Sequence, residues 1–208
     1  MKKIEDIVKG PQVKYGATFI GFVCYCLAVI TCLTVVLTAA GKLNFIFYDK
    51  SGMPSSATFN ERNYDPSNGG FSMTMKDGVR IWANDENEID PVTKIALVLV
   101  AAAGAVPSAL AYFFLGKVFY NVAKGDAFTE KNSSELIKAG VLKLAAVVLA
   151  PFAKVLICFL SNLISTSRIQ ISAAMLRLGD VIMAAAIITA GYVIRRGAEL
   201  QEEADHTL

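Results

Sequence analysis

The chain has 208 residues, of which 54% are hydrophobic and only 18% are charged. Soluble domains carry about 25% charged residues, so this composition is typical of a membrane protein. A net charge of +2 supplies no strongly basic surface, and no nucleic-acid partner is expected. The single histidine, His206, lies near the C-terminus, which argues against histidine-based metal or acid–base chemistry.

Four stretches are long and apolar enough to cross a membrane, because a hydrocarbon core of about 30 Å needs about 20 residues of helix. These stretches are 17–40, 95–116, 139–163 and 172–194. The first is far longer than a signal-peptide core of roughly 7–15 residues, so we predict that it is retained. The sequence therefore predicts an all-α membrane protein, with four transmembrane helices forming a bundle in one membrane domain over 1–208.

The distribution of Lys and Arg among the connecting segments predicts the orientation of the helices, because cytoplasmic loops carry an excess of them. Ten basic residues fall in the N-terminal segment, the loop 117–138 and the tail 195–208: Lys2, Lys3, Lys9, Lys14, Lys117, Lys124, Lys131, Lys138, Arg195 and Arg196. The short turn 164–171 contains only Arg168, and in 41–92 eight acidic residues outnumber five basic ones. Both termini and the loop 117–138 are therefore expected in the cytoplasm.

The extracytoplasmic segment 41–92 has the pattern of a small β-rich cap. The run "NFIFY" and the alternating run "FSMTMKDGVRIWA" predict strands, and Asp77–Gly78 is typical of a type I′ hairpin turn. The runs "SGMPSSA" and "YDPSNGG" predict turns. None of the four cysteines lies in this segment, so no disulfide framework is expected. So short a segment buries little surface, so the cap should lean on the helices or on another subunit.

Three charged side chains in the last two predicted helices form a candidate intramembrane polar cluster: Lys154, Arg177 and Asp180. A charge at the centre of a membrane helix costs about 2.5–3.5 kcal/mol on insertion scales, so such residues usually face a partner. Lys154 and Asp180 lie at similar depths, roughly 15 Å and roughly 12 Å from the outer ends of antiparallel neighbours. They are expected to pair, and Arg177 lies one turn away on the face of Asp180.

Two interpretations of this pair stay open, a buried ion pair that fixes helix register and an ion or proton pathway. Small and hydroxyl residues at helical spacing favour close helix packing around it. They are Ala173, Ala184, Ile187 and Gly191 in the fourth helix, Ala150, Cys158 and Ser161 in the third, and Thr31, Thr34 and Thr38 in the first. Pro107 and Pro151 are expected to kink the second and third helices.

The loop 117–138 is expected to continue the second helix, to break at Gly125 and to restart as a helix. Asn132 or Ser133 would cap the new helix, with Glu135 in its first turn. The acids of the tail are interpreted either as a solvated helix end or as a contact surface. In the second case their partner would be a cytoplasmic protein or the loop lysines Lys117, Lys124 and Lys131.

The loop and the tail resemble a family of small bacterial four-helix membrane proteins of unknown function. The matching residues are Gly125, Phe128, Thr129, Asn132, Leu136 and Gly140 in the loop, and Gly197, Glu199 and Leu200 in "RRGAELQEEADHTL". Members often end in Arg-x-Gly-x-Glu-Leu, acids and a terminal Thr–hydrophobic pair; His206 departs from the apolar residue expected beside the final threonine. Family genes often lie beside a phage-repressor-like helix-turn-helix regulator. The resemblance therefore implies a sensing, regulatory or protective role, and it offers no catalytic residues to carry over.

The common motifs of hydrolases, metalloproteases, redox proteins and nucleotide-binding enzymes do not occur in the sequence. We therefore predict a protein of the bacterial cytoplasmic membrane that is not an enzyme and uses no cofactor or metal. It would act through contacts with the lipid bilayer and with copies of itself or another membrane or cytoplasmic protein. The alternative is a small ion or solute transporter or channel subunit built around Lys154 and Asp180.

Overall fold

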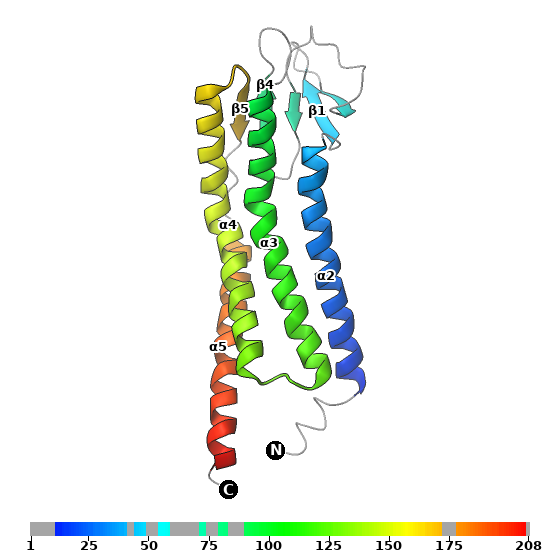
Figure 1. Ribbon diagram of the computed structural model, residues 1–208, viewed down its shortest axis with the longest axis vertical. Coiled ribbons are helices and arrows are strands. Elements are labelled where there is room, and N and C mark those ends of the chain that lie inside the picture. Colours follow the sequence, from blue (N-terminus) through cyan, green and yellow to red (C-terminus); the bar gives the residue numbers. More distant parts are fainter. Residues whose placement is uncertain are drawn as a thin grey trace. The chain divides into compact units, whose positions relative to one another are not determined.

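The computed structural model describes residues 11–40, 44–48, 54–58, 71–73, 79–82, 90–171 and 178–206, and its main elements are four long helices (Figure 1). They are α2 (Pro11–Ala39), α3 (Pro91–Lys124), α4 (Glu130–Ile164) and α5 (Leu178–His206). Each is long and apolar enough to cross a membrane. The prediction of an all-α protein with four candidate membrane spans is confirmed.

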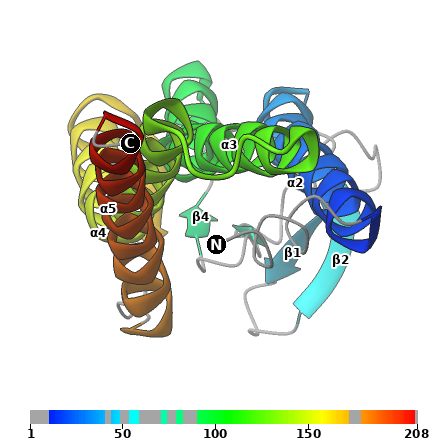
Figure 2. The same ribbon diagram turned by 90° about the horizontal axis from the view of Figure 1, so that it is seen from below.

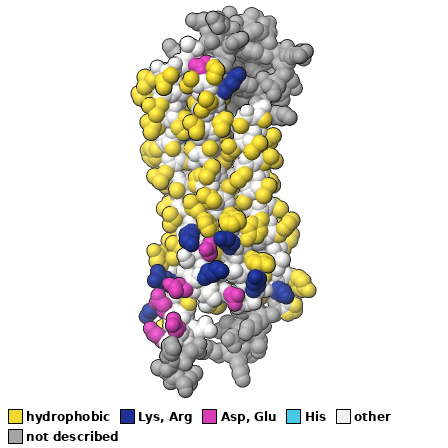
Figure 3. All heavy atoms as spheres, viewed as in Figure 1, with side chains coloured by type: hydrophobic (Ala, Val, Ile, Leu, Met, Phe, Trp, Pro, Cys, Tyr) yellow, Lys and Arg dark blue, Asp and Glu magenta, His cyan; other side chains and the backbone are white. Residues whose placement is uncertain are grey.

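Large apolar side chains stay exposed on all four helices, for example Phe19, Leu99, Phe152 and Ile182. Exposure of this extent would be costly in water and is expected for helices surrounded by lipid. On the face drawn in Figure 3, apolar side chains cover most of the helix surface, and charged ones gather near the α3–α4 connection. The buried side chains are mostly small, which allows helices in lipid to approach closely: Ala17, Ala101, Ala109, Ala111, Ala139, Ala150 and Ala184.

The helices run beyond several of the predicted spans. Because α3 ends at Lys124 and α4 begins at Glu130, only 125–129 of the predicted loop 117–138 is non-helical. At the other end of the chain, α5 continues past Arg196 to His206. The predicted beginning of the fourth span, at residue 172, lies outside the described residues. Pro107 and Pro151 stand inside continuous helices, and the kinks expected there stay predictions.

The chain divides into two compact units, which are described separately. Unit 1 consists of residues 1–32, 106–147 and 177–208, and unit 2 of residues 33–105 and 148–176. Within unit 1 each helix contacts its neighbour in the sequence, and Figure 2 shows α3 between α2 and the pair formed by α4 and α5. α2 and α3 are close enough that a Cβ atom on Gly116 would lie 2.9 Å from the ring of Tyr25.

The α4–α5 contact in unit 1 is closer still and involves a glycine on each helix. A Cβ atom on Gly140 would lie 2.5 Å from Cγ1 of Ile188 and 3.0 Å from its backbone nitrogen. A Cβ atom on Gly191 would lie 2.6 Å from Cγ1 of Ile137. The buried hydroxyl of Ser133 donates a hydrogen bond to the carbonyl of Gly191 at 2.9 Å. Ala184 and Gly191, both in the predicted small-residue stripe, are buried here.

Unit 2 contains a five-stranded antiparallel sheet in the order β2-β1-β3-β4-β5. The strands are β1 (Asn44–Tyr48), β2 (Pro54–Thr58), β3 (Phe71–Met73), β4 (Val79–Trp82) and β5 (Arg168–Ile171). β1 coincides with the predicted "NFIFY" strand, whereas β2 takes up the end of "SGMPSSA", which was predicted as a turn. The packing of this sheet as a cap stays a prediction.

Two further predictions for unit 2 differ from the observed pairing. A two-residue turn at Asp77–Gly78 would pair residue 76 with residue 79, whereas the strand pairing joins Met73 to Val79. The turn residues themselves lie outside the described part of the chain. The connection 164–171, predicted as a simple turn, contains β5, which pairs with β4.

Side-chain hydrogen bonds explain why the α4–α5 connection extends as a strand. The amide of Asn162 donates to the carbonyl of Ile169 at 2.8 Å and accepts from its N–H at 2.7 Å, so it replaces a neighbouring strand. Asp90 caps α3 by accepting from the N–H of Val92, and it also accepts from the N–H of Thr166 at 3.2 Å. Hydrogen bonding, first from the Ser165 hydroxyl and then from these N–H groups, lowers the pKa of Asp90.

Candidate functional site

The α3–α4 connection, which carries the loop residues of the predicted cytoplasmic motif, begins at a helix end closed by Gly125. The N–H of Gly125 donates to the carbonyl of Val122, and the N–H of Asp126 donates to that of Asn121, each at 3.0 Å. This pair of bonds defines a Schellman motif, whose C′ residue adopts a left-handed conformation. Gly125 has φ of 94°, which a side chain would strain. The predicted break at Gly125 is confirmed.

The new helix is capped by Thr129, so the prediction that Asn132 or Ser133 caps it is wrong. The Thr129 hydroxyl accepts from the N–H of Asn132 at 3.2 Å, and the Thr129 carbonyl accepts from the N–H of Ser133 at 3.0 Å. This is the pattern of an N-cap threonine three residues before the residue that it binds. The acid in the first turn is therefore Glu130 and not Glu135.

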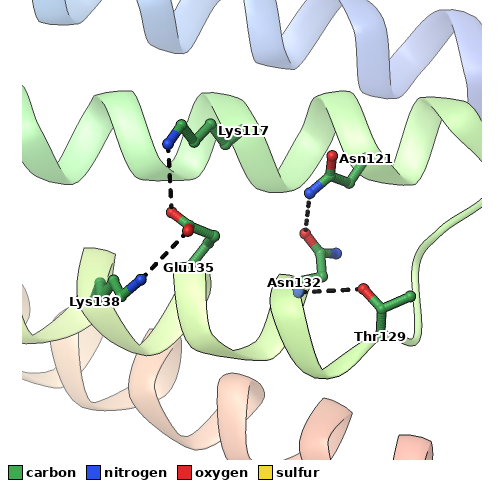
Figure 4. Close-up of polar contacts among 6 residues, drawn as sticks. All are labelled: Lys117, Asn121, Thr129, Asn132, Glu135 and Lys138. Atoms are coloured by element: carbon green, nitrogen blue, oxygen red, sulfur yellow. Dashed lines mark hydrogen bonds and ion pairs between the residues drawn. The ribbon is translucent and has the colours of Figure 1, made fainter.

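Asn132 is fully buried and links the connection to α3 (Figure 4). Its carbonyl oxygen accepts from the Asn121 amide at 3.3 Å, and its own amide donates to the carbonyl of Ala127 at 3.1 Å. One side chain thus holds the end of α3, the loop and the first turn of α4 together.

Glu135 is the second polar link between α3 and α4, and it is only 9% exposed. Its Oε1 atom accepts from Nζ of Lys138 at 3.4 Å, and its Oε2 atom lies 4.0 Å from Nζ of Lys117 (Figure 4). Oε2 is buried and accepts no hydrogen bond among the described residues. The Lys117 ammonium also lies over the rings of Phe113 and Phe114, at 4.8 Å and 5.3 Å from their centroids.

The structure brings the loop and tail parts of the predicted motif together. A Cβ atom on Gly197 of α5 would lie 3.7 Å from Cδ1 of Phe128. Phe128 is 52% exposed, and Leu200, one turn beyond Gly197, is 51% exposed. Glu199 forms ion pairs with Arg195 at 3.4 Å and with Arg196 at 2.9 Å. One of the tail acids, Glu199, thus forms its ion pairs within α5.

The intramembrane cluster is described only in part. Lys154 is half-buried on α4, and its Nζ atom lies 3.2 Å from the position of a Cβ atom on Gly104 of α3. Asp180 is half-buried at the beginning of α5, and Arg177 lies outside the described residues. Lys154 belongs to unit 2 and Asp180 to unit 1, so their pairing stays a prediction from the sequence.

Hydrogen bonds hold the residues of the α3–α4 connection against α3 and the first turn of α4. The Thr129 hydroxyl accepts a hydrogen bond from the backbone N–H of Asn132. The side-chain amide of Asn132 is hydrogen-bonded to the Asn121 amide and to the Ala127 carbonyl. Within the described ranges, no group of three or more His, Cys, Asp or Glu residues is placed to hold a metal ion. Sequence reasoning missed Asn121, Glu135 and Ser133 as linking residues, because their partners lie on other helices.

Replacing Asn132 by alanine is expected to lower the free energy of unfolding by about 2–3 kcal/mol. The change removes two hydrogen bonds, which contribute about 0.5–1.5 kcal/mol each, to the half-buried Asn121 amide and Ala127 carbonyl. It also empties the space of a fully buried side chain, which adds to the loss. Thermal unfolding in detergent, compared with Ser134→Ala on the exposed face of the same turn, measures the difference. Equal stability of the two variants would contradict the role assigned to Asn132.

The comparisons with known proteins give one family and no individual relative. No curated protein and no solved structure matches the chain. A family described as "Protein of unknown function (DUF2975)" matches residues 80–208, which run from β4 through α3, α4 and α5 and include both the loop and the tail. Because this match covers more than half of the chain, the protein belongs to the DUF2975 family.

Proposed function

We propose that the protein spans the bacterial cytoplasmic membrane four times, as a bundle, and senses, regulates or protects without catalysis. It would act through a partner held at its cytoplasmic end. The observation that carries this proposal is the proximity of Phe128 to Gly197, where an added Cβ atom would lie 3.7 Å from Cδ1 of the ring, so that the loop and the tail come together. We call Phe128, Gly197 and Leu200 the loop–tail surface.

The loop–tail surface has the properties of a binding surface on a firm support. Gly125, Thr129 and Asn132 hold the loop in place by the Schellman motif, the helix cap and the buried amide. Phe128 and Leu200 are left about half-exposed, and apolar side chains exposed together are typical of sites that bind a protein or the membrane. Its partner is a second copy of the chain or another membrane or cytoplasmic protein.

Photo-crosslinking in intact cells tests this surface. A photoreactive residue at Phe128 or at Leu200 should yield the same discrete crosslinked species, a dimer of the chain or a complex with one other protein. Glu130 and Gln201 are exposed neighbours outside the surface and serve as matched control positions. No crosslinked species, or equal yields from all four positions, would overturn the proposal.

The orientation is part of the proposal and rests on the excess of Lys and Arg in the segments assigned to the cytoplasm. In a variant without the native cysteines, a single cysteine at Ser67 should react with a membrane-impermeant reagent added to whole cells. A single cysteine at Ser134, which is exposed on α4, should react only after the cells are opened. Reaction of both from the same side would refute the assigned orientation.

A transporter or channel subunit is the second candidate, and the half-buried Lys154 beside Gly104 favours it, because charged side chains within spans often mark ion pathways. Reconstituted into vesicles, such a protein would conduct ions, and Lys154→Met would change the rate. Flux that depends on Lys154, without any crosslinked partner, would favour this second function over the first.

A further inference from the structure

A polar stripe runs along the last turns of α4, on the face that packs against α3 in unit 2. We call it the α4 stripe, and its members follow one another at one-turn spacing: Lys154, Cys158, Ser161 and Ser165. At one end the Ser165 hydroxyl is hydrogen-bonded to that of Thr93 at 2.6 Å. At the other end Nζ of Lys154 lies 3.2 Å from the position of a Cβ atom on Gly104. The two contacts are eleven residues apart on both sides, 93–104 and 154–165, so the stripe faces α3 over its length.

The hydroxyl of Ser161, in the middle of the α4 stripe, is buried without a hydrogen bond. The residue is 5% exposed, and its Oγ atom has no hydrogen-bond partner among the described residues. A hydroxyl on a helix can donate to the carbonyl four residues earlier, and those of Thr31, Thr38 and Thr189 do so in this chain. The Ser161 hydroxyl does not, although a buried hydroxyl without a partner costs about 1–3 kcal/mol. This group between α3 and α4 is therefore expected to bind a ligand that donates or accepts a hydrogen bond.

The α4 stripe joins a polar cluster at the helix ends to a charge deep in α4. The N–H of Ser165 donates to the Ser161 carbonyl at 2.8 Å, so the helical path continues to Ser165. The Ser165 hydroxyl is also hydrogen-bonded to the carboxylate of Asp90, and both residues are partly exposed, so water reaches this end. Lys154 lies eleven residues from Ser165, or about 16 Å along the helix. The Ser161 hydroxyl and the buried Cys158 thiol divide this length into steps of one turn.

We infer that water molecules bind along the α4 stripe and give Lys154 a hydrated route to the end of α4 at which Asp90 lies. One of them binds the Ser161 hydroxyl; a buried water makes about three hydrogen bonds, and the next polar group of the stripe and a neighbouring water supply the others. Water beside the ammonium reduces the cost of its charge within the membrane and lets it exchange protons with the aqueous phase. The inference deepens the second candidate function, on which any use of the route for transport rests, whereas the hydration itself does not depend on transport.

Infrared spectroscopy of the Cys158 thiol, in the full chain in lipid nanodiscs, tests the inference. A variant that keeps Cys158 as its only cysteine is transferred to heavy water, in which a thiol that contacts water exchanges S–H for S–D. The S–H band of Cys158 should be lost. Two controls should keep most of theirs. One keeps only Cys24, which is similarly buried on α2, and the other has Phe159→Cys as its only cysteine, at an exposed apolar position one residue away.

Ser161→Val, added to the Cys158 variant, should preserve the S–H band, because methyl groups take the place of the hydroxyl that binds water. Loss of the band equal to that of the parent would overturn the inference. So would a Cys158 band that persists without this change, which indicates a dry interface, or equal loss in the two controls, which indicates general entry of water.

If Ser161→Val fails to fold, Ser161→Ala decides by thermal unfolding. The midpoint should fall, because the bound water loses a partner. A rise would mean that the hydroxyl was buried without any partner, since removal of such a group is stabilising, and no change would mean that it binds nothing. Either result would overturn the inference. Both measurements are independent of ion flux, so a hydrated stripe in a chain that conducts no ions would refute the second candidate function alone.

Discussion

Gly140→Leu is expected to lower the free energy of unfolding by about 3 kcal/mol or to prevent the α4–α5 contact from forming. A Cβ atom at this position would lie 2.5 Å from Cγ1 and 3.0 Å from the backbone nitrogen of Ile188, and 3.2 Å from the carbonyl of Ala184. A side chain such as that of Ile188 can rotate away from an added atom, but the backbone atoms of α5 cannot move aside without separating the helices. Overpacking of this kind typically costs about 1–3 kcal/mol. A leucine side chain has three carbon atoms beyond Cβ, so its cost should lie at the upper end of this range.

Gly16→Leu is the matched control, because a Cβ atom on Gly16 of α2 has nothing within 4 Å. Leucine has a higher helix propensity than glycine by roughly 1 kcal/mol, so the control should be neutral or slightly stabilising. Thermal unfolding in the same detergent measures both variants. Similar losses at the two positions would indicate a general intolerance of glycine replacement, and no loss at Gly140 would contradict the close α4–α5 contact.

The helices could be predicted from the sequence because their signal is local. A run of about 20 apolar residues is sufficient to indicate a membrane helix, whatever it packs against. The break at Gly125 is equally local, since a left-handed C′ position favours glycine. The continuation of the second helix past Lys117 to this break was predicted as well, and α3 ends at Lys124.

The cap of α4 shows where local reasoning fails. Thr129, Asn132 and Ser133 are all residue types that cap helices, so composition alone does not choose among them. The structure uses Thr129 as the cap, because Asn132 binds Asn121 on α3 and Ser133 binds Gly191 on α5. These two partners are 11 and 58 residues away, and no pattern within α4 indicates them.

The connection between α4 and α5 was misjudged for the same reason. β5 is an edge strand of four residues, and its pairing with β4 joins segments far apart in the sequence. The amide of Asn162 makes both hydrogen bonds to Ile169 that a further strand would make. In a sequence, a single asparagine at a helix end predicts a cap or a turn. No sequence pattern indicates that its side chain will instead form the hydrogen bonds of a neighbouring strand.

The candidate site could be predicted in its parts but not in its assembly. The resemblance indicated Phe128 and Gly197 as separate features of the loop and the tail. Their proximity, which supports the loop–tail surface, depends on how α4 and α5 pack at Gly140 and Gly191. Glu135 was expected in the first turn of α4, but α4 begins at Glu130, and Glu135 is a buried link to Lys117.

Asp180→Ala and Lys154→Met, each made alone, are expected to lower the free energy of unfolding by about 3–5 kcal/mol. Removal of one partner of a buried pair leaves the other as a stranded charge, which accounts for a cost of this size. Both side chains are half-buried, and both fall in candidate membrane spans. Lys154 lies about ten residues, or roughly 15 Å, before the end of α4, a depth at which a lone ammonium is costly. Thermal unfolding in detergent measures the single variants.

The double variant, in which both residues are apolar, should recover much of the stability that either single variant loses. Replacement of a buried ion pair by apolar residues is often nearly neutral, because the cost of desolvating two charges disappears together with their attraction. A double-mutant cycle therefore separates a pair from two independent charges, since only a pair gives a large coupling energy. Harmless single changes, or a double variant that loses the sum of both, would show that the residues are not paired. A stable double variant that has lost the ion flux of the unaltered protein in vesicles would show that the pair has a functional role, and would favour the ion-pathway interpretation over a purely structural one.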